Sequence, residues 1–228
     1  MAENQNLLKV IHISLSFFLL FTAFYWCANV VSEVYSQNDY GSLGFYTIAA
    51  LYLSFAFSSL TCGPIVAKLG YIRSIQLGAF WYLVWVAAGI LPVTLKKTDS
   101  VTKLVWSIMI LAAILNGFGA SILWVGQGIY VSRCCNTENS GLYFGLFWSL
   151  LMFSQIFGNL MAAFVIDLFS QTVMFSVMAF FSFFGVWSFL FLRKPEAVNP
   201  IGMNGKYCFS YHCFKQNCHR FWINLIIT

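Results

Sequence analysis

Charged side chains are scarce in this 228-residue chain, where Asp, Glu, Lys and Arg make up only 8% of the sequence. Soluble domains carry about 25% of these residues, because a folded globule needs a polar surface to face water. Here 60% of the residues are hydrophobic and 25 are Phe. The composition therefore excludes an ordinary soluble domain and predicts an integral membrane protein.

Proline and histidine are also rare, with four and three residues respectively. The prolines lie at the ends of apolar runs or beyond the last one, so none should kink a helix in mid-membrane. No nucleophile elbow, paired-acid or phosphate-loop motif occurs, and the Cys and His residues after position 200 fit no standard zinc finger. We therefore expect no enzyme activity, no cofactor, no metal and, with the bases dispersed, no nucleic-acid partner.

Six apolar stretches are long enough to cross a bilayer as helices, since a hydrocarbon core about 30 Å thick takes roughly 20 helical residues. The first stretch is too long for a secretion signal and is followed by five others, so we expect it to be retained. The predicted fold class is all-α, a polytopic membrane protein with a six-span domain over 1–194 and a disordered or truncated cytoplasmic tail over 195–228. The predicted spans lie near residues 10–31, 44–66, 74–93, 104–131, 141–166 and 171–192.

Bases in the connecting loops predict the orientation of these spans. Cytoplasmic loops are enriched in Lys and Arg. The loops on the side of the N-terminus hold six such residues, and those on the other side hold Lys96, Lys97 and Lys103. Both termini are therefore predicted to be cytoplasmic, while plasma membrane and endomembrane stay open. The six are Lys9, Lys68, Arg73, Arg133, Arg193 and Lys194.

Uncharged polar residues gather on single faces of three spans. At about 100° per residue, Asn116 and Gln127 share a face of the fourth span, and Gln155 and Asn159 share a face of the fifth. Thr22 and Asn29 share a face of the first span. Such a face either holds helices together by hydrogen bonds or lines a watery cavity, and both interpretations stay open. The candidate substrate-path residues are Asn29, Asn116, Gln127, Trp148, Gln155 and Asn159.

The stretch between the second and third spans resembles a signature of the major facilitator superfamily. Gly63, Lys68 and Gly70 match its spacing, Ala67 stands where the family usually has Asp, and Arg73 comes one place late. The resemblance implies a candidate inner-gate loop at Gly63, Lys68, Gly70 and Arg73 that lacks the family's aspartate contacts. A plain positively charged turn is the alternative interpretation.

Two further stretches, 117–128 and 139–159, resemble the Unc-ninety-three-like branch of that superfamily, nearest the subgroup of major facilitator domain-containing protein eleven. The resemblance implies the N-terminal six-helix half of a twelve-span fold, in which substrate sites lie between the halves. We expect either a truncated product or a half that works with a second copy or a complementary half.

Two functions are compatible with this resemblance. The first is transport of a small solute by alternating access. We expect no proton relay in this half, because the predicted spans contain no Asp, Glu, Lys or Arg, whereas a complementary half could carry one. The alternative is a non-transporting accessory that regulates an ion channel or the trafficking of a membrane receptor. The expected partners are accordingly the lipid bilayer, a second half, and a channel or receptor.

Overall fold

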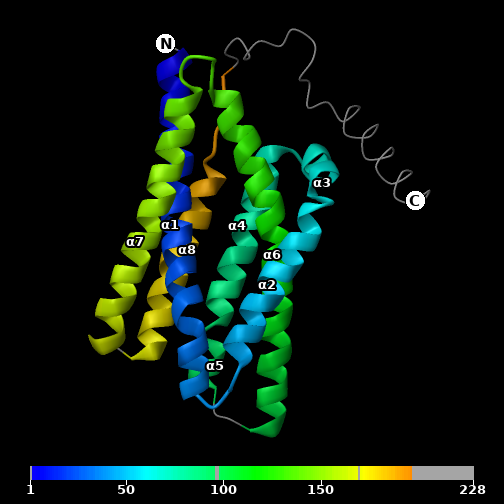
Figure 1. Ribbon diagram of the computed structural model, residues 1–228, viewed down its shortest axis with the longest axis vertical. Coiled ribbons are helices and arrows are strands. Elements are labelled where there is room, and N and C mark those ends of the chain that lie inside the picture. The colour runs from blue at the N-terminus through cyan, green and yellow to red at the C-terminus, as the bar shows by residue number, and fades with distance from the viewer. Residues whose placement is uncertain (1, 96–97, 169, 197–228) are drawn as a thin grey trace, which may run out of the picture.

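The computed structural model describes residues 2–95, 98–168 and 170–196, and all regular secondary structure in these ranges is helical. The predicted all-α class is confirmed (Figure 1). Residues 197–228, which hold most of the predicted tail, lie outside the described residues. The helices are α1 (Ala2–Gln37), α2 (Leu43–Ser59), α3 (Cys62–Leu69), α4 (Tyr71–Ala88), α5 (Leu91–Thr94), α6 (Asp99–Cys134), α7 (Ser140–Leu168) and α8 (Gln171–Leu190).

Five segments of the described chain are long and apolar enough to cross a membrane, and α2 with α3 makes a sixth if a broken span is counted. The predicted span over 44–66 is broken in the structure, where α2 and α3 meet at 74°. Two local features explain the break. The Ser58 and Ser59 hydroxyls donate to carbonyl oxygens four residues back, and Pro64 has no N–H to donate to Leu60.

Other boundaries differ because hydropathy marks only the part of a helix that lies in lipid. Helices α1 and α6 each run for 36 residues, well beyond the predicted 10–31 and 104–131. The third predicted span, 74–93, begins earlier at Tyr71 and is divided between α4 and the short α5.

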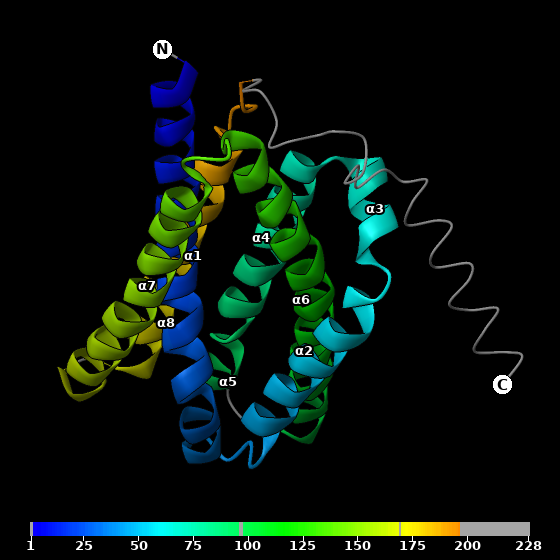
Figure 2. The ribbon, with the colours of Figure 1, turned by 45° about the horizontal axis from the view of Figure 1, so that its top comes forward.

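Helices α1 and α6 are the two central helices of the bundle. Helix α1 packs mainly on α7 and α8, α6 packs mainly on α2 and α4, and α4 packs on α8. Exchanging the first triplet (α1, α2, α4) for the second (α6, α7, α8) leaves this set of pairs unchanged. Figures 1 and 2 show α1, α7 and α8 on one side, with α2, α4 and α6 on the other. This pairing is the one expected of an inverted repeat of three spans.

Glycine allows the closest helix contacts at symmetric places in this arrangement. A Cβ on Gly158 of α7 would lie 2.7 Å from the Thr22 carbonyl oxygen of α1, and one on Gly117 of α6 would collide with the Leu51 carbonyl oxygen of α2. Small residues let membrane helices approach closely. Each central helix therefore approaches a neighbour closely at a glycine, which belongs to α7 in one contact and to α6 in the other.

Aromatic rings fill the space between the two groups of helices. Phe21 of α1 lies 5.1 Å from Tyr82 of α4 and 5.3 Å from Trp124 of α6, measured between ring centroids. Phe17 lies 5.0 Å from Phe147 of α7. Offset and tilted ring pairs at such distances add to packing. This core fixes where the exposed residues of the same helices point.

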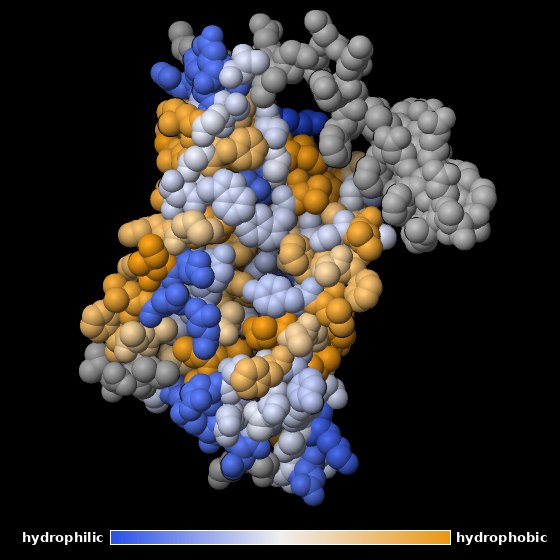
Figure 3. Space-filling model, viewed as in Figure 1, coloured by the Kyte–Doolittle hydropathy of each residue, from blue (hydrophilic) through white to orange (hydrophobic). Residues whose placement is uncertain are grey.

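The surface is apolar around the middle of the bundle and polar at both ends (Figure 3). Of the seven Lys and Arg residues described, six lie at the end that holds the N-terminus and α3, and Lys103 lies at the other. Lys96 and Lys97 lie outside the described residues. The chain is thus an integral multi-pass membrane protein, and its cytoplasmic termini stay a prediction.

Candidate functional site

Two of the predicted path residues meet between α1 and α7. The side-chain nitrogen of Asn29 donates a hydrogen bond to the side-chain oxygen of Asn159, and both side chains are exposed. An amide pair of this kind joins two membrane helices. Because each amide keeps further polar atoms at the surface, the pair both joins helices and makes their shared face polar.

Gln155 and Trp148 extend this face along α7. Both are exposed, and Gln155 makes no side-chain hydrogen bond to another described residue. The Trp148 ring stacks on that of Trp124 in α6, with centroids 5.8 Å apart and an interplanar angle of 12°. In Figure 3 a hydrophilic patch lies over α1 and α7 amid the apolar surface. We call Asn29, Trp148, Gln155 and Asn159 the open polar face.

The structure does not bring Asn116 and Gln127 to the open polar face. They lie on the inner side of α6, with 0% and 4% of their surface exposed. Both polar atoms of Asn116 and the side-chain nitrogen of Gln127 have no hydrogen-bond partner among the described residues. The predicted shared face of α6 is present, but it points into the bundle.

Three tyrosines lie on three different helices, α1, α2 and α4. Tyr25 of α1 and Tyr82 of α4 both contact the Phe21 ring, with centroids 5.7 and 5.1 Å away, and Tyr52 belongs to α2. Tyr52 is exposed, Tyr25 half-buried and Tyr82 buried. The sequence gives no signal for this group, because helix periodicity relates residues within one helix and not across three.

The candidate inner-gate residues do not form a loop. Gly63 and Lys68 lie in α3, and Arg73 lies in the first turn of α4. Gly70, with φ of +88°, is the single residue between these helices, and a positive φ of this size favours glycine. Lys68 and Arg73 are exposed, and Ala67 beside them supplies no carboxylate.

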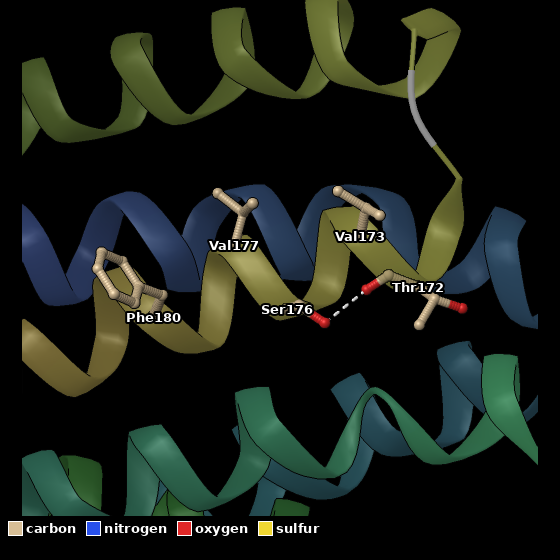
Figure 4. Close-up of a pocket in the computed structure, with 5 residues that line it drawn as sticks. All are labelled: Thr172, Val173, Ser176, Val177 and Phe180. Atoms are coloured by element: carbon tan, nitrogen blue, oxygen red, sulfur yellow. Dashed lines mark hydrogen bonds between the residues drawn. The ribbon is translucent and has the colours of Figure 1, made fainter.

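One surface pocket of about 320 Å³ is lined by α8 alone (Figure 4). Its only hydrogen bond among the drawn residues runs from the Ser176 hydroxyl to the Thr172 carbonyl oxygen, within one helical turn. The other lining residues are Val173, Val177 and Phe180. An apolar groove on a single helix suits a lipid chain, and no group of three metal-binding side chains occurs within the described residues.

Comparison with known families decides what the chain is. The sequence model of a family described as "Ion channel regulatory protein UNC-93" matches residues 40–227. The chain belongs to the UNC-93 family. The resemblance predicted from the fourth and fifth spans is thus confirmed, although the match continues past residue 196, where the sequence patterns ended.

Three relatives illustrate this membership. The chain is 34% identical over 167 residues to UNC93-like protein MFSD11 of Xenopus laevis, covering 69% of this chain and 34% of that protein. It is 32% identical to UNC93-like protein 3 of Arabidopsis thaliana, covering 66% and 31%. It is 28% identical to Protein unc-93 homolog A of Homo sapiens, covering 74% and 35%. The UNC-93 chain thus spans about a third of the length of these relatives.

A solved structure shares the fold. The crystal structure of the peptide transporter POT in complex with sulfate superposes with a TM-score of 0.58 and 13% identity, covering 100% of this chain and 48% of that one. At this identity the likeness concerns the fold alone. It supports the predicted six-helix arrangement, half of a major facilitator fold.

Proposed function

We propose that this UNC-93 chain supplies one six-helix half of a facilitator-type carrier, whose open polar face lines the path of a small solute moving by alternating access. The observation that carries the proposal is the exposure of Asn29, Gln155 and Asn159 within membrane-crossing helices. An amide facing hydrocarbon leaves hydrogen-bonding groups unsatisfied, at a cost of about 2–7 kcal/mol each. This face is therefore better suited to water, a solute or a second half than to lipid.

The buried amides of α6 support the same proposal. Leaving a buried polar group unpaired costs about 1–3 kcal/mol. Asn116 and Gln127 lie three turns apart on the side of α6 that faces the bundle interior. A polar solute or water reaching the inner side of α6 would satisfy them, which fits a path better than plain helix packing.

The residues of the path indicate what kind of solute it takes. The open polar face offers amides, which donate and accept hydrogen bonds, together with the exposed ring of Trp148. The six predicted spans hold no Asp, Glu, Lys or Arg to neutralise an ion. We expect a small solute without net charge, bound by hydrogen bonds and ring stacking.

Uptake into vesicles tests the proposal. The 228-residue chain is reconstituted alone and with an added complementary half, and a panel of radiolabelled neutral solutes is offered. Gln155→Ala should lower uptake by roughly tenfold, since one hydrogen bond to a polar solute contributes about 1.5 kcal/mol. The matched control is Ser176→Ala, which removes an exposed hydroxyl that bonds only within α8 and should leave uptake unchanged. Equal uptake by both variants and empty vesicles contradicts the proposal.

A second candidate is a non-transporting accessory of an ion channel or membrane receptor. It is favoured by the family description, which names ion channel regulation, and by the exposed aromatic side chains of α2. These include Phe45, Tyr46, Tyr52 and Phe57. Co-purification of a channel, abolished by Phe57→Ala while uptake stays at background, would support this function over transport.

A further inference from the structure

Basic side chains are concentrated at one end of the bundle, around the junction of α3 and α4. Lys68 and Arg73 flank this junction, Arg133 ends α6, and Arg193 and Lys194 follow α8. All five side chains are exposed. They come from three separate parts of the sequence, near residues 68–73, 133 and 193–194, so the fold and not a local charge run brings them to this end. We call these five residues the basic rim.

Aromatic contacts tie these segments together. The Arg133 guanidinium lies 4.6 Å from the centre of the Tyr71 ring, and Tyr71 also contacts Tyr130 with centroids 6.1 Å apart. The Tyr130 hydroxyl donates a 2.8 Å hydrogen bond to the Arg193 carbonyl oxygen. The end of α6 therefore holds the start of α4 on one side and the chain after α8 on the other.

Carboxylates at this end do not neutralise the basic rim. Among the described residues the single ion pair joins Lys9 to Glu196 at 3.4 Å, and Glu3 accepts a hydrogen bond from Asn139. Ala67, next to Lys68, carries no charge. The five cations of the basic rim are thus without a carboxylate partner in the part of the chain that the structure describes.

We infer that the basic rim binds the phosphate-bearing headgroup of an acidic phospholipid. The cations lie where membrane-crossing helices end, which is the depth of the headgroups, and Tyr71 has the place of an interfacial aromatic residue. Arg binds phosphate oxygens through paired N–H donors. Acidic lipids are concentrated in the cytoplasmic leaflet, the side to which loop bases assign this end.

Lipid retention tests this inference without reference to transport. The full chain is reconstituted in phosphatidylcholine containing a minor fraction of phosphatidylserine, extracted in mild detergent, and the lipids that stay bound are counted by native mass spectrometry. The chain should retain phosphatidylserine in preference to phosphatidylcholine. Arg133→Gln should reduce that preference roughly fivefold, the effect of one cation near an anionic headgroup.

Two variants separate a built site from general attraction. Arg133→Lys keeps the charge and should retain most of the preference, while Lys103→Gln removes an exposed cation at the opposite end and should change it less than twofold. Thermal unfolding in detergent without phosphatidylserine checks that each variant folds. A preference that Lys103→Gln lowers as much as Arg133→Gln, or no preference at all, overturns the inference.

Inorganic phosphate distinguishes the source of the headgroup chemistry. If the site recognises a lipid, phosphate added at the ionic strength of a matched chloride control should displace no more phosphatidylserine than the chloride does. Complete displacement by phosphate alone would show a site for a soluble anion and would overturn the assignment to lipid.

Discussion

The polar faces of α6 and α7 are built from similar residues and meet different surroundings. Each face carries amides at helical spacing, yet those of α7 are exposed and include one that pairs with α1, whereas those of α6 are buried without partners. The difference arises because α6 lies between α2 and α4, while α7 has α1 as its one extensive neighbour. Periodicity thus identifies a shared face, and helix packing decides what that face meets.

The largest losses of stability should come from substitutions of the glycines at which these helices contact their neighbours. Gly117→Leu on α6 and Gly158→Leu on α7 would each force a side chain into a neighbouring backbone, lowering the free energy of unfolding by about 3 kcal/mol. Chemical unfolding in detergent, followed by circular dichroism, measures the change.

The matched controls are Gly128→Leu on α6 and Gly145→Leu on α7, where an added Cβ meets nothing within 4 Å. These should stay within about 0.5 kcal/mol of the native chain. If a control costs as much as its partner, close helix contact is not what these glycines provide.

Replacing a buried amide and replacing an exposed, paired amide should change the free energy of unfolding in opposite directions. Asn116→Leu replaces an unpartnered buried amide by an apolar side chain of similar size and should stabilise the isolated protein by about 1 kcal/mol. Asn159→Leu removes the partner of Asn29 and should destabilise it by about 0.6 kcal/mol. The same unfolding assay compares them, and a shared sign would remove the distinction between the two faces.

The Trp124–Trp148 stack is the ring contact that connects these faces. Trp148→Ala should lower the free energy of unfolding by about 1 kcal/mol, because the stack and part of the ring's buried area are lost while half the ring already faces outward. Trp187→Ala, an exposed ring on the outer side of α8, is the size-matched comparison. If Trp187→Ala lowers the free energy of unfolding more than Trp148→Ala does, the Trp124–Trp148 stack does not stabilise the bundle beyond ordinary ring packing.

The last prediction concerns the reactivity of a thiol in the segment that leads from α6 to α7. Burial raises the pKa of the Cys135 thiol to about 11, so its thiolate fraction at neutral pH is roughly 100-fold below that of a free thiol. Alkylation of Cys135 by iodoacetamide, followed by peptide mass spectrometry, should be very slow at pH 7 and should accelerate as the pH rises toward 11. Rapid labelling at pH 7 would show that this segment is open.

Much of the fold could be predicted from composition and run length alone. Helices in lipid must satisfy their own backbone hydrogen bonds, so apolar runs such as 171–192 identified α8 nearly to the residue. The break between α2 and α3 was not predicted, because hydropathy carries no information on where serine hydroxyls and a proline interrupt a helix. The ends of α1 were not predicted, because a helix can continue beyond the apolar run into the polar interface.

The site was predictable only in part, and for a different reason. Asn29 and Asn159 stood out as amides in apolar runs, and the structure brings them together. Asn116 and Gln127 looked the same in sequence but face inward. The Tyr25, Tyr52 and Tyr82 group depends on the relative rotation of three helices, which no single helix encodes.

The exchange of neighbours between the two triplets has a consequence for biogenesis. Helix α1 is synthesised before α7 and α8, which are its main neighbours. Until α7 is made, the Thr22 backbone lacks its contact with Gly158, and the Asn29 amide lacks its hydrogen-bond partner Asn159. Helix α1 must therefore remain in the membrane without its main neighbours while α2, α4 and α6 are made, and it packs fully only when α7 and α8 follow.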